Sequence, residues 1–196
     1  MAAEPLVVAV VPAAGQSTRF GSIKLLADLG GAPLLQRTLA SLLDAGVARV
    51  VVVTREDQGF EAVPSMADSR VSTVVNPDPA RGMFSSIQAG LADAGGDVVL
   101  VLPADMPFVA PGTVAAVVAR AAATGSVIVP VHQGSNGHPL AVPSAVRDRL
   151  LPLDPATTLK DALAAVGASR ETLDVADPGV LRDVDVPSDL AGQAQG

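Results

Sequence analysis

The chain has 196 residues, of which 49% are hydrophobic, so it can bury a sizeable core and is not a disordered protein. Its formal net charge of −7 argues against a nucleic-acid backbone as partner, and an aromatic content of 2%, without Trp or Tyr, argues against base stacking. The absence of cysteine excludes disulfides, thiolate metal sites and cysteine nucleophiles.

Valine-rich apolar runs recur along the chain and predict β-strands. They are continuous rather than alternating, which is typical of strands buried on both faces of a parallel sheet. The runs are Leu6–Val11, Val50–Val53, Val71–Val75, Val98–Leu102 and Val127–Val131. The first is too short to span a bilayer, and no basic stretch precedes it as in a signal peptide. We therefore expect a soluble, cytoplasmic protein without a membrane partner.

Helical patterns lie between these runs. Pro33–Ala45 begins at a proline and is followed by a glycine, and Ser85–Ala94 and Pro111–Thr124 are also closed by glycine. Alternating strands and helices predict an α/β fold with an open, mostly parallel sheet and right-handed crossovers. Further on, GHPLAVP predicts a turn and a short strand, and Thr158–Val166 predicts a helix capped by Thr157 or Thr158. VLRDVDVPSDL predicts a last strand that runs into a turn or helix.

Four polar stretches follow predicted strands. They are Pro12–Lys24, Asn76–Ser86, Pro103–Phe108 and His132–His138. Ligands of open α/β sheets bind at the carboxyl ends of the strands, and in a parallel sheet most of these stretches meet at one edge. The sequence therefore predicts a ligand site there.

The stretch PAAGQSTRFGSIKLL, which begins at residue 12, has the ingredients of a phosphate-binding loop. Gly15 lets backbone N–H groups approach an anion without a Cβ in the way. Ser17 and Thr18 can donate hydrogen bonds, and Arg19 and Lys24 supply positive charge. The stretch matches neither the Walker A pattern nor GxGxxG, and a plain turn with two solvated cations remains the alternative.

Aspartates in two other stretches are candidate metal ligands. LPADMPF places Asp105 just past a strand end, where a carboxylate opposite a cationic phosphate loop suits Mg²⁺. The alternative is a turn aspartate before a proline. DVDVPSD offers Asp183 and Asp185, one of which is a candidate second ligand.

Two further stretches offer polar groups to a ligand. NPDPARGMFSSIQAGL contains Asn76, Gly82, Ser85 and Ser86, and its serines either cap a helix or hydrogen-bond the edge of a planar base. His138 in GHP is weaker evidence, since a lone histidine is more often structural than catalytic.

In this order, the stretches resemble the MobA-like nucleotidyltransferases, from Val7 to about Leu190. The first is similar to the family signature (L/P)-A-(A/G)-G-x-S-x-R-(M/F)-G-x-x-K-L-L. Its residues here are Ala13, Ala14, Gly15, Ser17, Arg19, Phe20, Gly21, Lys24, Leu25 and Leu26. Ala14, the serine-containing stretch and GHP resemble the molybdenum cofactor cytidylyltransferase branch. Met106 in PADMPF is closer to the guanylyl branch, and PATTLKDAL lacks the glycine-rich turn of cytidylyl enzymes.

The resemblance implies a single-domain, three-layer Rossmann-like sandwich of the nucleotide-diphospho-sugar transferase type over residues 1–196, with a core of about 6–190 and a flexible C-terminal tail. It implies that a phosphate on the acceptor attacks the α-phosphorus of a nucleoside triphosphate, with CTP favoured, and that pyrophosphate leaves. The implied acceptor is the phosphate of molybdopterin or the molybdenum cofactor, and the implied cofactor is Mg²⁺. A transient contact with a molybdoenzyme or its chaperone is a further implied partner.

The resemblance also assigns roles. Arg19 and Lys24 stabilise the leaving pyrophosphate, and Asp105, with Asp185 or Asp183, holds Mg²⁺. The nucleotide is bound by Ala13, Ala14, Gly15, Ser17, Thr18, Arg19, Lys24, Asn76, Gly82, Ser85 and Ser86, and the acceptor by Gly137 and His138. Three alternatives stay open: a guanylyltransferase, another cytidylyltransferase of a small phosphate acceptor, and a non-catalytic nucleotide- or pterin-binding accessory protein.

Overall fold

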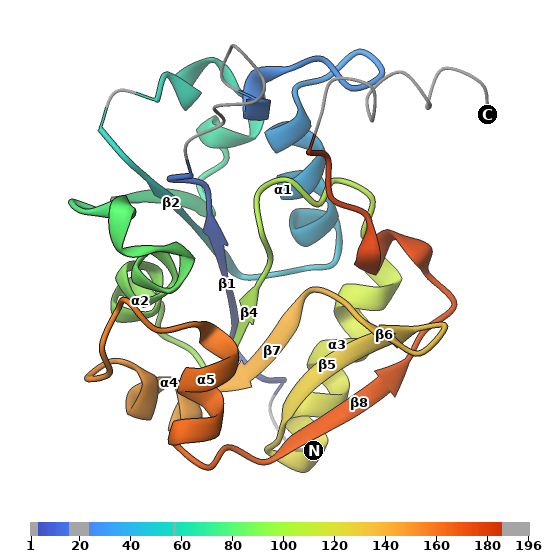
Figure 1. The fold of residues 1–196 in the computed structure, drawn as a ribbon. Coiled ribbons are helices and arrows are strands. Elements are labelled where there is room, and N and C mark those ends of the chain that lie inside the picture. The colour runs from blue at the N-terminus through green and yellow to red at the C-terminus, as the bar shows by residue number, and fades with distance from the viewer. Residues whose placement is uncertain (1–3, 16–23, 57, 186–196) are drawn as a thin grey trace.

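The valine-rich runs form a mixed sheet in the computed structural model, which describes residues 4–15, 24–56 and 58–185 (Figure 1). The strands are β1 (Val7–Pro12), β2 (Arg49–Thr54), β3 (Val71–Val75), β4 (Val98–Val101), β5 (Val127–His132), β6 (Ser135–Asn136), β7 (Leu140–Pro143) and β8 (Arg170–Asp174). Their order in the described part of the chain is β3-β2-β1-β4-β7-β5-β6, and β8 pairs with β5. β1, β2, β3 and β4 pair in parallel, as β8 does with β5, whereas β7 is antiparallel to both β4 and β5.

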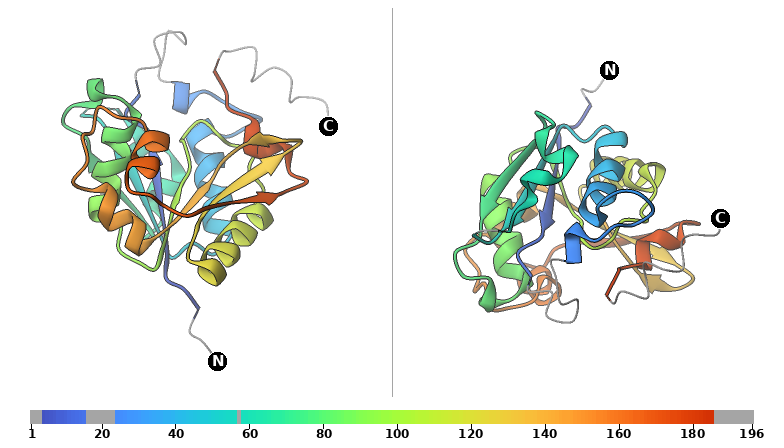
Figure 2. Two further views of the ribbon diagram at one scale, coloured as in Figure 1. Left: turned by 60° about the horizontal axis from the view of Figure 1, so that its bottom comes forward. Right: turned by 90° about the horizontal axis from the view of Figure 1, so that it is seen from above.

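Helices cover both faces of the sheet. The α-helices are α1 (Leu34–Asp44), α2 (Met83–Asp93), α3 (Pro111–Thr124), α4 (Ser144–Leu150) and α5 (Leu159–Ala165). The 3₁₀ turns are η1 (Lys24–Leu26), η2 (Phe60–Ala62), η3 (Pro64–Ala67), η4 (Pro79–Arg81) and η5 (Pro178–Leu181). Figure 2 shows α1 and α3 on one face and α2, α4 and α5 on the other. No helix in the described ranges is long and apolar enough to cross a membrane.

Alternation along the buried strands divides the core into two halves. Ala9 and Val11 of β1 pack in a cluster that contains the apolar residues of α1 and α3. Val8 and Val10 point the other way, into a cluster with the residues of α2, α4 and α5. Successive side chains of a strand point to opposite faces, so an all-apolar strand needs a helical layer on each side. The predicted three-layer α/β sandwich is thus confirmed.

Gly90 lets α2 lie close against the sheet. A Cβ at this position would be 2.4 Å from Cγ1 of Val10 and 2.8 Å from Cγ2 of Val53, which is closer than carbon atoms approach without displacement. Both valines are fully buried in β1 and β2, so neither has free space to move into. The glycine therefore fixes the distance between α2 and the sheet.

We expect Gly90→Ala to lower the free energy of unfolding by about 1–3 kcal/mol, because the added methyl group overpacks the core. Urea denaturation of the two proteins measures this difference. Gly112→Ala in α3 is the matched control: a Cβ there meets nothing within 4 Å, and alanine favours a helix more than glycine does. A Gly90→Ala variant as stable as the parent would contradict the close packing of α2.

The strands predicted from the valine-rich runs and the helices predicted between them are confirmed. The short strand predicted in GHPLAVP is β7. Thr158 caps α5 as predicted, because its hydroxyl oxygen accepts from the Asp161 amide. The last predicted strand, in VLRDVDVPSDL, is wrong. Its described part forms η5 and an irregular segment, because the Val184 amide bonds to the Asp105 carbonyl in a loop rather than to a sheet strand. The last strand that the structure describes is instead β8, which lies earlier in the chain.

Candidate active site

At the carboxyl edge of the sheet, backbone hydrogen bonds join the start of each loop to the end of a neighbouring strand. The Ala13 amide donates to the Val53 carbonyl at 2.8 Å, so the first residue after β1 is held at the end of β2. The Ala104 amide donates to the Pro12 carbonyl at 3.3 Å, which holds the loop after β4 at the end of β1. The Asn76 amide donates to a carbonyl of β2 at 2.7 Å. The predicted convergence of polar stretches is therefore present at the ends of the first four strands.

The segment after β8 reaches the same edge. Because β7 runs antiparallel to both β4 and β5, β5 points in the direction of β4, and β8 is parallel to β5. The residues that follow β8, Asp177–Asp185, then pass beside the loop after β4, where the Val184 amide donates to the Asp105 carbonyl at 3.0 Å. We call Asp177–Asp185 the C-terminal strap.

Lys24 joins two aspartates that come from different loops. Its ammonium nitrogen donates to Oδ2 of Asp105 at 2.9 Å and to Oδ1 of Asp185 at 3.1 Å. Lys24 is only 8% exposed, whereas both carboxylates are open to solvent on one side. A buried cation therefore holds a carboxylate from the loop after β4 next to one from the strap.

Burial and neighbouring charges both act on the ionisation of this cluster. Burial lowers the pKa of Lys24, but hydrogen bonds and charges from Asp105 and Asp185 outweigh it, so the pKa lies above its ordinary value of 10.5. Burial and the negative charge of Asp185 raise the pKa of Asp183; the charge of Asp105 adds to this, while a backbone hydrogen bond and Lys24 oppose it. Among the described residues of the site, the positive charge of Lys24 thus lies beside an excess of carboxylates.

The donor set fits Mg²⁺ bound together with a phosphate group. Mg²⁺ prefers oxygen ligands and usually binds through one or two carboxylates, waters and phosphate oxygens. Asp105 and Asp185 supply two such carboxylates side by side. Residues 4–15, 24–56 and 58–185 contain no group of three or more His, Asp or Glu side chains that could hold a metal ion, so waters and phosphate oxygens would have to complete the coordination of Mg²⁺. Asp183 forms no ion pair with Lys24 in these ranges, so the geometry favours Asp185 over Asp183 as the partner of Asp105.

The first predicted loop is described only in part. Ala13 and Ala14 are buried, and Gly15 is exposed with nothing within 4 Å of the position that a Cβ would take. Gln58, which the sequence analysis did not single out, supports this turn: its amide nitrogen donates to the Ala13 carbonyl at 3.0 Å. Its amide oxygen accepts from the Arg55 amide at 2.8 Å. The candidates Ser17, Thr18 and Arg19 lie outside the described residues.

The predicted base-binding side chains after β3 face inward. The Asn76 amide nitrogen donates to Oγ of Ser85 and of Ser86, at 2.9 Å each, and all three residues are buried. The Ser85 hydroxyl donates in turn to the Gly82 carbonyl at 2.7 Å. These hydrogen bonds hold the loop against the start of α2, and the oxygen of each serine hydroxyl accepts from Asn76.

The surface of this loop is formed by its glycine and by neighbouring residues. Gly82 has φ of 104°, a conformation that favours glycine, and it precedes the first residue of α2. That residue, Met83, is 61% exposed. A ligand that approaches this loop would therefore meet Gly82 and Met83 rather than the serines.

The GHP turn packs against the C-terminal strap. A Cβ on Gly137 would lie 2.4 Å from the Val180 carbonyl oxygen, and the His138 amide donates to that same oxygen at 2.9 Å. Burial lowers the pKa of His138, although a hydrogen bond with the Val101 backbone and the charges of Asp105 and Asp183 partly offset the effect. Its buried Nδ1 has no hydrogen-bond partner among the described residues. Both predicted acceptor-binding residues thus pack against Val180 of the strap that also carries Asp183 and Asp185.

The lowered pKa of His138 predicts a pH-dependent stability. Between the ordinary histidine value of about 6.5 and the lower folded value, the unfolded chain binds more protons than the folded one. Stability is therefore lost as pH falls through this window, and His138 contributes nothing above it. We expect His138→Gln to lose less stability than the parent protein between pH 7.5 and pH 5.5 in urea denaturation. His132→Gln, at the only other histidine, is the control and should lose as much stability over this pH range as the parent. If His132→Gln rather than His138→Gln reduced the loss of stability, His138 would not be the group responsible.

The open α/β fold and the loops gathered at this edge define a protein that binds its ligand at the carboxyl ends of the strands. The model of the MobA-like NTP transferase domain matches residues 9–172. The chain therefore belongs to the MobA-like NTP transferase family, which its motifs resemble. A nucleotidyl transferase from Methanothermobacter thermautotroptrophicus has the same fold, with a TM-score of 0.76 at 23% identity over 95% of each chain.

Curated relatives carry different activities in their names. A 2-C-methyl-D-erythritol 4-phosphate cytidylyltransferase of Rhodococcus opacus is 37% identical over 64% of this chain and 55% of its own length. A probable molybdenum cofactor guanylyltransferase of Natronomonas pharaonis is 35% identical over 52% of this chain and 50% of its own. The molybdenum cofactor cytidylyltransferase of Escherichia coli is 23% identical over 92% of both. The chain thus matches only about half the length of the first two relatives.

Proposed function

We propose that this protein transfers the nucleoside monophosphate of a nucleoside triphosphate, with CTP favoured, to the phosphate of molybdopterin or the molybdenum cofactor. Pyrophosphate is the second product. The observation that carries the proposal is the contact of Lys24 with both Asp105 and Asp185 at the carboxyl edge of the sheet. Membership of the MobA-like NTP transferase family supports the reaction class.

In this reaction the protein has to align the reacting groups and neutralise their negative charge. An oxygen of the acceptor phosphate forms a bond to the α-phosphorus, the bond between that phosphorus and the bridging oxygen to the β-phosphate breaks, and pyrophosphate leaves. Such a displacement needs in-line alignment and neutralised charge, with little covalent work. Asp105 and Asp185 would hold Mg²⁺, which when bound supplies positive charge to the phosphate being transferred.

Lys24 is suited to the leaving pyrophosphate. An ammonium group has three N–H donors, and the two carboxylates accept from two of them. The third donor can therefore bind a phosphate oxygen without breaking either contact. Because the side chain is buried, its charge is little screened by solvent and acts strongly over a short distance.

Four observations bear on the choice of CTP. The E. coli cytidylyltransferase aligns over 92% of both chains, which supports a cytidylyl activity over the full fold. Met106, the residue that resembles the guanylyl branch, is 4% exposed and belongs to the core, so it does not face a ligand. The Natronomonas relative supports the alternative, a molybdenum cofactor guanylyltransferase. Ala14 is buried behind Gly15, so its Cβ can act on the base only through the position of the loop.

Steady-state kinetics with one pterin phosphate acceptor decides the nucleotide. We expect kcat/KM for CTP to exceed that for GTP and ATP by about tenfold or more, the range that a difference in pocket size supports. A preference for GTP would assign the chain to guanylyl transfer. Transfer with none of the three, at nucleotide concentrations where binding is measured, would support the non-catalytic accessory protein instead.

A further inference from the structure

Asp177 connects two helical starts that lie far apart in the sequence. Its Oδ1 accepts from the Gly179 amide at 2.8 Å and so caps η5. Its Oδ2 accepts from the Ala110 amide and from the Thr113 hydroxyl, both at 2.8 Å. Ala110 is the N-cap of α3 and has no side chain that could cap it. Asp177 therefore supplies to α3 the cap and the negative charge that a helix N-terminus favours.

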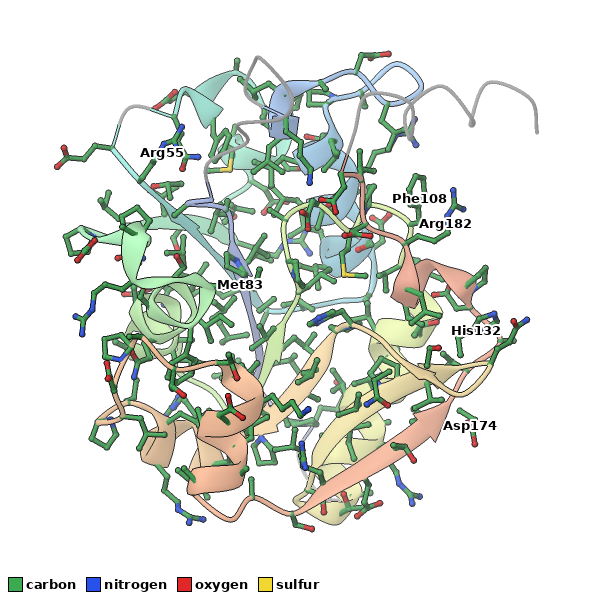
Figure 3. All side chains as sticks on the ribbon, in the orientation of Figure 1. Arg55, Met83, Phe108, His132, Asp174 and Arg182 are labelled. Atoms are coloured by element: carbon green, nitrogen blue, oxygen red, sulfur yellow. The ribbon has the colours of Figure 1, made fainter. Side chains whose placement is uncertain are left out.

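The middle of the strap is in close contact with the loop after β4. A Cβ on Gly179 would lie 2.0 Å from the carbonyl oxygen of Phe108, so only glycine permits this approach. The guanidinium of Arg182 lies 4.1 Å from the centre of the Phe108 ring, and Figure 3 shows the two side chains together. Both contacts hold the strap against residues that directly follow Asp105.

The far end of the strap sets the position of the candidate metal ligands. The Val184 amide donates to the Asp105 carbonyl, and the next residue, Asp185, meets Asp105 at Lys24. No strand pairing among the described residues joins these two segments. Their alignment therefore depends on the contacts of the strap. The hydrogen bonds of Asp177 hold one end of the strap, and the hydrogen bond of the Val184 amide holds the other.

We propose that Asp177 is a positioning residue, which holds the strap so that Asp185 stands beside Asp105 in the geometry needed to bind a divalent cation. Asp177 is beyond residues 9–172, the part matched by the family model. The catalytic consequence rests on the proposed function, but the positioning itself does not. Groups that orient metal ligands from a second layer often change metal affinity by roughly ten- to a hundredfold when they are removed.

Two measurements that need no turnover test this inference. Binding of Mn²⁺, followed by calorimetry with a non-hydrolysable CTP analogue, is expected to weaken about tenfold or more in Asp177→Ala, and less in Asp177→Asn, which keeps one accepting oxygen. Hydrogen exchange of the Val184 amide, measured without nucleotide or metal, is expected to become faster in both variants. Gly179→Ala, which displaces the strap from Phe108, should reproduce both effects.

Thr158→Ala is the matched control, because it also removes a helix cap but on α5, on the other face of the sheet. It should lower the unfolding temperature without changing Mn²⁺ affinity or Val184 exchange. Mn²⁺ binding by Asp177→Ala at the parent's affinity, or equal weakening by Thr158→Ala, would overturn the inference. If the parent protein binds no Mn²⁺, the metal pair of the proposed function fails, and unchanged Val184 exchange in Asp177→Ala would separately overturn the positioning.

Discussion

Replacing Lys24 by alanine is expected to lower kcat by about a hundredfold or more, the loss that follows removal of a preorganised electrostatic donor. The buried ammonium bonds to Asp105 and Asp185, and its remaining donor is the charge available to the leaving pyrophosphate. Lys24→Met separates charge from packing, because it keeps the apolar stem and loses only the ammonium. Single-turnover rates at saturating nucleotide measure the effect.

The chain offers a natural control for this change. It contains only two lysines, and the other, Lys160, is exposed on α5. Lys160→Ala should leave the rate unchanged. If Lys24→Met retained the parent rate at saturating nucleotide, Lys24 would have no part in the chemistry, and its role would be to hold the two carboxylates together.

Asp105→Asn is expected to reduce metal-dependent turnover by about 10³-fold, because a catalytic metal supplies several kcal/mol of charge stabilisation that an amide cannot recruit. The fold should persist, since the backbone carbonyl of Asp105 still accepts from the Val184 amide. Rates measured against Mg²⁺ concentration, with circular dichroism of the same samples, test both statements.

The control for this variant is Asp148→Asn, which removes a carboxylate that pairs with a neighbouring arginine on α4. It should have the parent's rate and the parent's dependence on Mg²⁺. An Asp105→Asn protein that Mg²⁺ still activates with unchanged affinity would place the metal elsewhere, and Asp183 and Asp185 would be the next ligands to test.

The layers of the fold could be predicted because each buried strand is a continuous apolar run between helices with an apolar stripe. β8 was missed for the opposite reason. Its sequence, RETLD, has charged residues and no apolar run, because β8 pairs only with β5 among the described strands and is partly open to solvent. α4 was missed because seven residues with three charges give too little periodicity.

The site could be predicted in its chemistry but less well in its geometry. Lys24 and Asp105 follow strands, so the direction of the strands places them at one edge. Asp185, the second carboxylate bonded to Lys24, is 161 residues away from it in the sequence. Its position depends on contacts of the strap that no local sequence pattern indicates. Ser85 and Ser86 have the residue types of a base-binding segment, yet their side chains are buried and bonded to Asn76.

The fate of a labelled phosphate tests the central claim most directly. The protein is incubated with a pterin phosphate, a divalent cation and CTP that carries radioactive phosphorus in its α-phosphate. We predict that the label appears in the pterin product, that unlabelled pyrophosphate is released in equal amount, and that neither forms without the cation. Label recovered only as free CMP, or release of inorganic phosphate in place of pyrophosphate, would contradict nucleotidyl transfer and indicate a hydrolase.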